Sequence, residues 1–114
     1  MEDLRPGRRA ERRAEWWYRL RGYRMLQTNA WAGGYELDLV VRRGRRLVFC
    51  EVKEKRGHGF GAPEDMVDEE KQRRLRRAGN AWLAAHPEAA GLTVSFDVIA
   101  VQGRRLRRLG GAID

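Results

Sequence analysis

Two short segments in the middle of the chain alternate charged and aliphatic side chains. They are Glu36–Asp38 and Glu51–Lys53, each with an aliphatic residue at its centre. A period of two residues is the pattern of a β-strand with one polar and one apolar face. Burying a charge in such a strand is costly unless a partner compensates for it. The pattern therefore predicts two neighbouring strands, over about 35–42 and 46–54, whose charged groups have a function.

The polar turn between these strands sets how they would pair. Gly44 and the arginine after it suit a two-residue hairpin loop of type II′, which favours glycine first. With that loop, Asp38 lies opposite Glu51, and Glu36 lies opposite Lys53, on one face of the sheet. A slip by one residue would send the two carboxylates to opposite faces. The register therefore predicts that Asp38 and Glu51 share one cation. The same register pairs Val41 with Val48, Val40 with Phe49, and Leu39 with Cys50.

The rest of the chain predicts two helices and three further strands, with no linker that would divide it. The predicted segments are helices over 7–21 and 63–85, and strands over 24–28, over 93–101 and in a short basic stretch ending near Leu109. The resulting order is α-β-β-β-α-β-β. The sequence thus predicts a single α/β domain over residues 1–114, with a mixed central sheet flanked by helices and a short extra C-terminal strand.

Each predicted helix has a stripe of residues expected to be buried. The stripes are Ala10, Ala14 and Trp17 in the first helix, and Val67, Leu75, Ala78 and Trp82 in the second. Glu11 lies at the border of the first stripe, and Lys71 fills a gap in the second. Such a lysine either extends its ammonium group to solvent or reaches a polar pocket on the sheet. Trp31 falls in a predicted loop over 29–34, where core packing is expected and stacking on an unpaired base is the alternative.

The balance of charge favours a polyanionic partner. The 114 residues have a formal net charge of +8 at pH 7, and only Lys53, Lys55 and Lys71 among the 24 basic side chains are lysines. One cysteine cannot form an internal disulfide, which fits a reducing compartment. No apolar run suits a signal peptide or approaches the roughly 20 residues of a membrane span. We therefore expect a soluble, cytoplasmic protein without membrane contact.

Residues along most of the chain, including the two charged segments, form one ordered set of motifs. They are Gly7, Glu11, Ala14, Gly22-Tyr23, Asn29, Glu36–Val40, Val48–Lys53, Phe60-Gly61, Pro63, Val67, Lys71, Ala78, Trp82-Leu83 and Phe96–Val98. With the order of elements, they resemble the PD-(D/E)xK nuclease superfamily, and more narrowly the bacterial YraN family in its Holliday-junction-resolvase-like branch. The resemblance implies a restriction-endonuclease-like α-β-β-β-α-β core over about residues 7–103. The usual arginines before the first acidic motif and before Phe96 are absent, which affects expected substrate contacts more than metal binding.

The same resemblance implies a metal-dependent endonuclease that hydrolyses phosphodiester bonds in branched or single-stranded DNA, acting as a homodimer. It implies that Asp38 and Glu51 bind Mg²⁺ or Mn²⁺, that Lys53 orients the attacking water, and that Glu11 is a further catalytic acid. Oxygen ligands without a Cys/His cluster favour these hard cations over zinc. The residues expected to support the site or bind substrate are Glu36, Lys71, Arg42, Arg43, Arg73 and Arg74.

Other interpretations of the same residues remain open. Glu36 against Lys53 would form an ordinary ion-paired sheet face, although two carboxylates directly opposite each other argue against that reading. Glu11 and the arginines are equally compatible with solvated surfaces. Two other classes of function also fit the basic composition: a non-catalytic nucleic-acid-binding protein that keeps the nuclease fold, and a structural protein bound to ribosomal RNA. Neither class requires Asp38, Glu51 and Lys53 together.

Overall fold

The structure, a computed structural model, describes residues 8–55 and 68–113. The elements are α1 (Arg8–Arg19), β1 (Arg24–Ala32), β2 (Tyr35–Arg43), β3 (Arg46–Glu54), α2 (Glu69–Ala85), the short 3₁₀ helix η2 (Pro87–Ala89), β4 (Thr93–Gln102) and β5 (Arg105–Ile113). The five strands form one sheet in the order β1-β2-β3-β4-β5, in which β3 and β4 are parallel and all other neighbours are antiparallel. The predicted α/β class, mixed sheet and order of helices and strands are confirmed.

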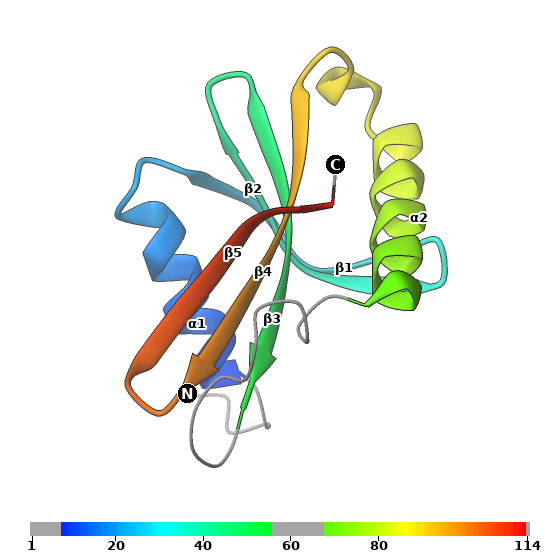
Figure 1. The fold of residues 1–114 in the computed structure, drawn as a ribbon. Helices are drawn as coiled ribbons and strands as arrows, with labels where there is room; N and C mark the ends of the chain where they lie inside the picture. Colours follow the sequence, from blue (N-terminus) through cyan, green and yellow to red (C-terminus); the bar gives the residue numbers. More distant parts are fainter. Residues whose placement is uncertain (1–7, 56–67, 114) are drawn as a thin grey trace.

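The two helices cover opposite faces of the sheet (Figure 1). The core on the α2 side is built from Ala30, Leu37, Val40, Leu47, Phe49, Leu75, Ala78, Trp82, Ala89, Val98 and Ala100. The core on the α1 side is built from Ala10, Ala14, Tyr18, Leu39, Val41, Val48, Cys50, Ile99 and Val101. Strands buried on both faces become nearly continuous apolar runs, which explains the sequences of β3 and β4.

Helix α1 buries a stripe with a spacing of four residues. Ala10, Ala14 and Tyr18 are each at most 1% exposed, whereas Trp17, predicted to belong to this stripe, is only partly buried. Tyr18 can be buried because its hydroxyl donates a hydrogen bond to Asp97 at 2.6 Å. The chain leaves the helix through Gly22, whose φ of +87° favours glycine.

Helix α2 begins at Glu69 because Asp68 caps its first turn, with the Asp68 carboxylate accepting a hydrogen bond from the backbone N–H of Lys71 at 2.8 Å. Leu75, Ala78 and Trp82 are buried as predicted. A Cβ atom on Gly79 would lie 2.8 Å from the ring of Phe96, so glycine permits the close approach of this helix to β4. Three sequence predictions lie outside the described residues: the helix start at Pro63, the stripe position Val67 and the loop residue Phe60.

Strand β1 is longer than the sequence predicts. The predicted loop over 29–34 is wrong, since Ala30 pairs with Leu37 and Ala32 with Tyr35, leaving Gly33 and Gly34 as a two-residue turn. Both glycines have positive φ, as a type I′ turn requires. The expectation that Trp31 packs in the core is also wrong, because its side chain is 73% exposed. Asparagine and alanine disfavour strands in isolation, which explains the misreading.

The β2–β3 hairpin forms at the predicted turn. Arg43 pairs with Arg46, and Gly44 has a φ of +59° while the residue after it does not have positive φ, as type II′ requires. The three predicted apolar pairs are made, from Val41 with Val48 to Leu39 with Cys50. The predicted register therefore holds over the half of the hairpin nearest its turn.

Candidate metal site at the fork between β2 and β3

The ladder between β2 and β3 ends at the pair of Leu39 and Cys50. Beyond it, the backbone N–H of Val52 donates to Oδ2 of Asp38 at 2.7 Å. In a regular antiparallel ladder with this register, that N–H would instead bond to the backbone of Leu37. A side-chain carboxylate thus takes the place of a backbone acceptor, and the two strands separate into a fork.

This fork corrects the predicted cross-strand pairs. Asp38 does not lie opposite Glu51 in the ladder, and Glu36 does not lie opposite Lys53. Instead, the Asn29 side chain donates to Glu36 at 2.8 Å. The prediction that Asp38 and Glu51 lie directly opposite each other requires the ladder to continue for one more pair. The ladder ends before that pair, at Leu39 and Cys50.

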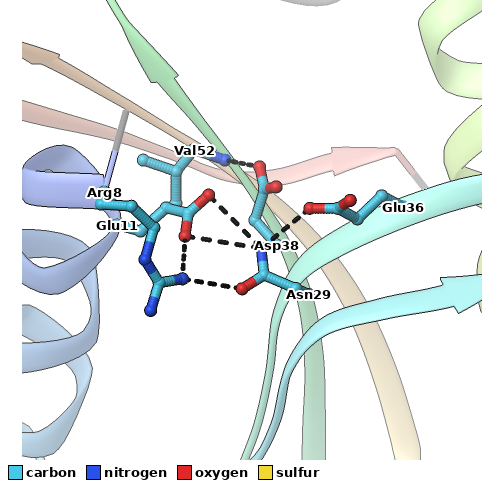
Figure 2. Close-up of polar contacts among 6 residues, drawn as sticks. All are labelled: Arg8, Glu11, Asn29, Glu36, Asp38 and Val52. Carbon is cyan, nitrogen blue, oxygen red and sulfur yellow. Dashed lines mark hydrogen bonds and ion pairs between the residues drawn. The ribbon is translucent and has the colours of Figure 1, made fainter. Parts of the chain in front are cut away.

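The alternation of faces along β2 also breaks at the fork. Leu37 and Val40 both pack in the core on the α2 side, although strict alternation would place them on opposite faces. Leu39 packs on the α1 side, and Asp38 points toward Glu11 of α1 (Figure 2). The paired strand β1 is distorted at the same level, where Asn29 has a φ of +51°. Asparagine tolerates this left-handed conformation better than most residues.

Three carboxylates converge on the α1 side of the fork. Glu11, Glu36 and Asp38 each place one oxygen within 4.8 Å of the others, the one such acidic group among residues 8–55 and 68–113. Asn29 joins them, since its side-chain amide donates to Glu36 and more weakly to Glu11 at 3.4 Å (Figure 2). Arg8 donates to Glu11 at 2.8 Å and to the Asn29 side-chain oxygen at 2.7 Å. We call this group the carboxylate cluster.

Asp38 is the carboxylate of the cluster most affected by its surroundings. The pKa of Asp38 is raised to about 7, chiefly by burial and also by the nearby charges of Glu11, Glu51 and Glu36, while the hydrogen bond from Val52 opposes the rise. No described lysine or arginine forms an ion pair with Asp38. A carboxyl group in this position gains from a proton or a metal cation, because either neutralises its charge.

Glu51 lies outside the cluster, turned toward α2. Its Oε1 atom accepts a hydrogen bond from the Tyr35 hydroxyl at 3.1 Å and lies 3.3 Å from Nζ of Lys71. Its other oxygen, Oε2, is buried and has no hydrogen-bond partner among the residues that the structure describes. Burial, together with the charge of Glu51, raises the pKa of Tyr35 above its usual value. Glu51 therefore has one satisfied oxygen and one that still requires a partner.

The two predicted lysines have different surroundings. Lys71 reaches the polar pocket on the sheet, because its ammonium group pairs with Glu51, and the alternative of extension to solvent is wrong. Lys53 is half-buried on β3 and forms no ion pair with any described carboxylate. Both ammonium groups come from elements that border the fork.

The predicted arginines are not gathered at the cluster. Arg42 donates to the carbonyl of Gly44, and Arg43 donates to the carbonyl of Arg21. Arg73 and Arg74 each pair with a glutamate one turn earlier on α2. No sequence signal predicts the contacts that Arg8 makes with Glu11 and Asn29, or that Tyr35 makes with Glu51. The family resemblance matches Asn29 to a family position without assigning a role to it.

A second buried carboxylate, Asp97 on β4, differs from Asp38 in being satisfied. Asp97 is 1% exposed and accepts hydrogen bonds from Tyr18, from Arg108 at 3.1 Å and from the backbone of Gly111 at 3.3 Å. Burial raises the pKa of the neighbouring Cys50 thiol, which leaves it protonated. Asp97 has the partners of a structural ion pair, whereas Asp38 has no ion-pair partner among the described residues and Glu51 has one buried oxygen without a hydrogen bond.

None of the described helices is long and apolar enough to cross a membrane.

Comparisons with known proteins agree with each other on family. The model of the Uncharacterised protein family UPF0102 matches residues 10–101. A UPF0102 protein of Methylobacterium nodulans is 42% identical over 109 residues, covering 95% of this chain and 83% of that protein. Others from Methylorubrum extorquens (45% identical, 78% and 68% covered) and Parvibaculum lavamentivorans (43% identical, 91% and 77% covered) are similar. The chain therefore belongs to the uncharacterised protein family UPF0102.

Proposed function

We propose that this protein is a divalent-metal-dependent nuclease that hydrolyses phosphodiester bonds in DNA. The observation that carries the proposal is Asp38: a largely buried carboxyl group beside two other carboxylates, with a raised pKa and no ion-pair partner in the described chain. Ionisable groups with strongly perturbed pKa values concentrate at functional sites. A site that binds a cation would explain why this arrangement is present.

The side chains at the fork fit a hard divalent cation. Asp38 and Glu11 would hold Mg²⁺ or Mn²⁺, with Glu36 adjacent, because these cations prefer oxygen ligands. Glu51 would contribute its Oε2 atom, which is buried without a hydrogen-bond partner in the described part of the chain. When bound, the cation would polarise the phosphate, promote ionisation of water and stabilise the leaving oxygen.

The residues of the chain would supply positioning and charge. Arg8 and Asn29 orient Glu11, and the backbone of Val52 orients Asp38. Lys53, which has no described carboxylate partner, would orient water or neutralise charge that develops on the phosphate. Lys71 would do the same next to Glu51. Fixed groups of this kind need not reorganise as the reaction proceeds.

The finer aspects of the proposal come from the resemblance to PD-(D/E)xK nucleases. The spacing of Glu36, Asp38, Glu51 and Lys53 resembles the motif of that superfamily, and its resolvase-like branch suggests branched or single-stranded DNA in the cytoplasm. A homodimer would allow one assembly to address two strands.

A second candidate is a non-catalytic nucleic-acid-binding protein with the same fold. The observation that favours it is the ion pair between Glu51 and Lys71, which leaves Glu51 apart from the carboxylate cluster. If Glu51 serves only to hold Lys71, the fork would lack part of a metal site, and the basic side chains would act alone.

One assay separates the two candidates. The purified protein is incubated with single-stranded, duplex and four-way-junction DNA, in Mg²⁺, in Mn²⁺ and in a chelator. We expect metal-dependent cleavage that Asp38→Asn, Glu11→Gln and Glu51→Gln each abolish. Glu15→Gln is the matched control, because Glu15 lies one turn after Glu11 and pairs with Arg19 on the surface. Equal cleavage by wild type and Asp38→Asn would exclude the catalytic assignment, and DNA binding without cleavage would favour the second candidate.

A further inference from the structure

A pocket of about 240 Å³ lies at the C-terminal end of α1, apart from the carboxylate cluster. It is lined by Trp17, Arg21, Tyr23, Arg43, Arg46 and Arg108. We call it the arginine pocket. Trp17 follows Glu11 by six residues, which is about 9 Å along the helix axis. The pocket is therefore a separate feature on the same α1 side of the sheet.

Aromatic rings contact three of the four arginines of this pocket. The guanidinium carbon of Arg21 lies 3.8 Å from the centre of the Trp17 ring, and that of Arg108 lies 4.9 Å from it. Arg43 lies 4.9 Å from the centre of the Tyr23 ring. Stacking uses the flat face of a guanidinium group and leaves the N–H groups on its edge able to donate. The pocket thus presents preorganised hydrogen-bond donors.

Most of this positive charge is not neutralised within the described chain. Asp97 pairs with Arg108, but Arg21 and Arg43 donate only to backbone carbonyls. Arg46 is exposed and forms no ion pair with a described carboxylate. Each guanidinium group carries five N–H donors, so many donors stay available to a bound anion.

The size and shape of the pocket select the kind of anion. At about 240 Å³ it is smaller than the roughly 300–1,000 Å³ of sites for drug-sized ligands. A carboxylate offers only two oxygens to several guanidinium groups, whereas a phosphate offers more and suits bidentate contacts. A second hollow of about 380 Å³, lined by Gly22, Arg24, Arg42, Arg43 and Gly44, shares Arg43 with the first. Two adjoining basic hollows match a polymer of phosphates better than one isolated anion.

We propose that the arginine pocket binds a backbone phosphate of a nucleic-acid strand and positions that strand on the α1 side of the sheet. The inference extends the proposed nuclease function, since the strand would continue toward the carboxylate cluster. It does not require catalysis, because a phosphate contact provides affinity and orientation without chemistry.

The test measures binding in a chelator on the Asp38→Asn background, so that cleavage plays no part. A fluorescent single-stranded oligonucleotide is titrated at several salt concentrations. We expect the Arg43→Ala/Arg46→Ala double variant to bind about 10- to 30-fold more weakly at 0.1 M salt, with the slope of log affinity against log salt reduced by about 1.4. The matched control is Arg104→Ala/Arg107→Ala, which removes two exposed arginines near the β4–β5 turn. It should change the affinity by less than about two-fold and leave the slope unchanged.

Four results would overturn the inference. The first is an equal loss in the pocket variant and its control, with thermal unfolding confirming that both fold. The second is that inorganic phosphate stabilises the protein against thermal unfolding and the pocket variant loses this stabilisation, while the affinity of the pocket variant for the oligonucleotide stays unchanged. This result would indicate that the pocket binds a small free anion. The third is tighter binding of poly-glutamate than of the oligonucleotide. The fourth is an unchanged oligonucleotide affinity of the pocket variant in a protein whose cleavage is lost in Asp38→Asn, and this result would reject only this inference. If the pocket variant binds more weakly but the wild-type protein cleaves no DNA, only the nuclease proposal is rejected.

Discussion

Trp31 lies directly opposite Glu36 in the β1–β2 ladder, and its indole is 73% exposed next to the carboxylate cluster. An exposed tryptophan beside a polar site is suited to stack on an unpaired base. We predict that Trp31→Ala weakens binding of single-stranded DNA by about 5- to 150-fold, the range expected for loss of one stacked base. Binding of blunt duplex DNA should change much less. Fluorescence anisotropy with both substrates measures the difference.

The control for this prediction is Trp16→Ala. Trp16 is also exposed, at 60%, but it lies on α1 and forms no part of the cluster. Equal losses of affinity in the two variants would indicate a general effect of removing an exposed indole, and would contradict a role for Trp31 in stacking.

Asp38 should make the metal-free protein less stable as pH rises. Its pKa is about 7 in the folded protein against 3.8 as the ordinary value, so the unfolded chain loses this proton first. The folded state is therefore penalised increasingly between about pH 4 and pH 7, and the penalty persists above that range. We predict that Asp38→Asn stabilises the metal-free protein at pH 8 by roughly 3 kcal/mol and has little effect at pH 4. Denaturant unfolding at the two pH values measures this.

A divalent cation should reverse that penalty. Mn²⁺ should raise the melting temperature of wild type at pH 8, because a ligand that binds only the folded state stabilises it. The Asp38→Asn variant should respond much less, and Glu15→Gln should respond like wild type. An identical metal response in wild type and Asp38→Asn would show that the cation binds elsewhere.

Lys71 and Glu51 should depend on each other. Their atoms are 3.3 Å apart, and both side chains are largely but not fully buried, at 20% and 16% exposed. We predict that Lys71→Met and Glu51→Gln each destabilise the protein, and that the double variant loses less than the sum, with a coupling of about 0.5–1 kcal/mol. A thermodynamic cycle from urea unfolding measures the coupling. Strict additivity would show that the ion pair contributes nothing to stability.

Asp97 should matter for folding and not for metal binding. Replacing it with alanine leaves the buried Tyr18 hydroxyl and the Arg108 guanidinium without their carboxylate. We predict a loss of about 3–5 kcal/mol for Asp97→Ala, as for other broken buried pairs. Urea unfolding measures the loss, and any folded fraction should keep the Mn²⁺ response of wild type. A variant that folds normally but no longer responds to Mn²⁺ would reverse this assignment.

The sequence predicts the hairpin well as far as local rules determine it. Gly44 selects the turn, and the turn fixes the register up to Leu39 and Cys50. The fork beyond this point depends on a side-chain carboxylate that replaces a backbone acceptor and on the positive φ of Asn29. Neither is determined by residue periodicity. The sequence therefore identifies Asp38 and Glu51 as unusual, but it pairs them across a ladder that ends one pair earlier, at Leu39 and Cys50.

Helical spacing predicts which face of α1 is buried, with one revealing error. The choice between Trp17 and Tyr18 depends on a long-range partner, Asp97 on β4, which no local pattern can supply. Trp17 is left at the border, where it contacts arginines instead. For Lys71, its position in the apolar stripe of α2 predicts either extension to solvent or contact with the sheet, and the ion pair with Glu51 decides for the sheet.

The two outer strands of the sheet differ in a way that bears on self-association. β5 carries Arg105, Arg107 and Arg108 along its length, and positive charges on an edge strand repel an identical strand brought alongside. β1, at the other border, exposes Leu26 and Trp31. If two copies extend their sheets into one another, the join forms at β1, and the β5 border stays in water.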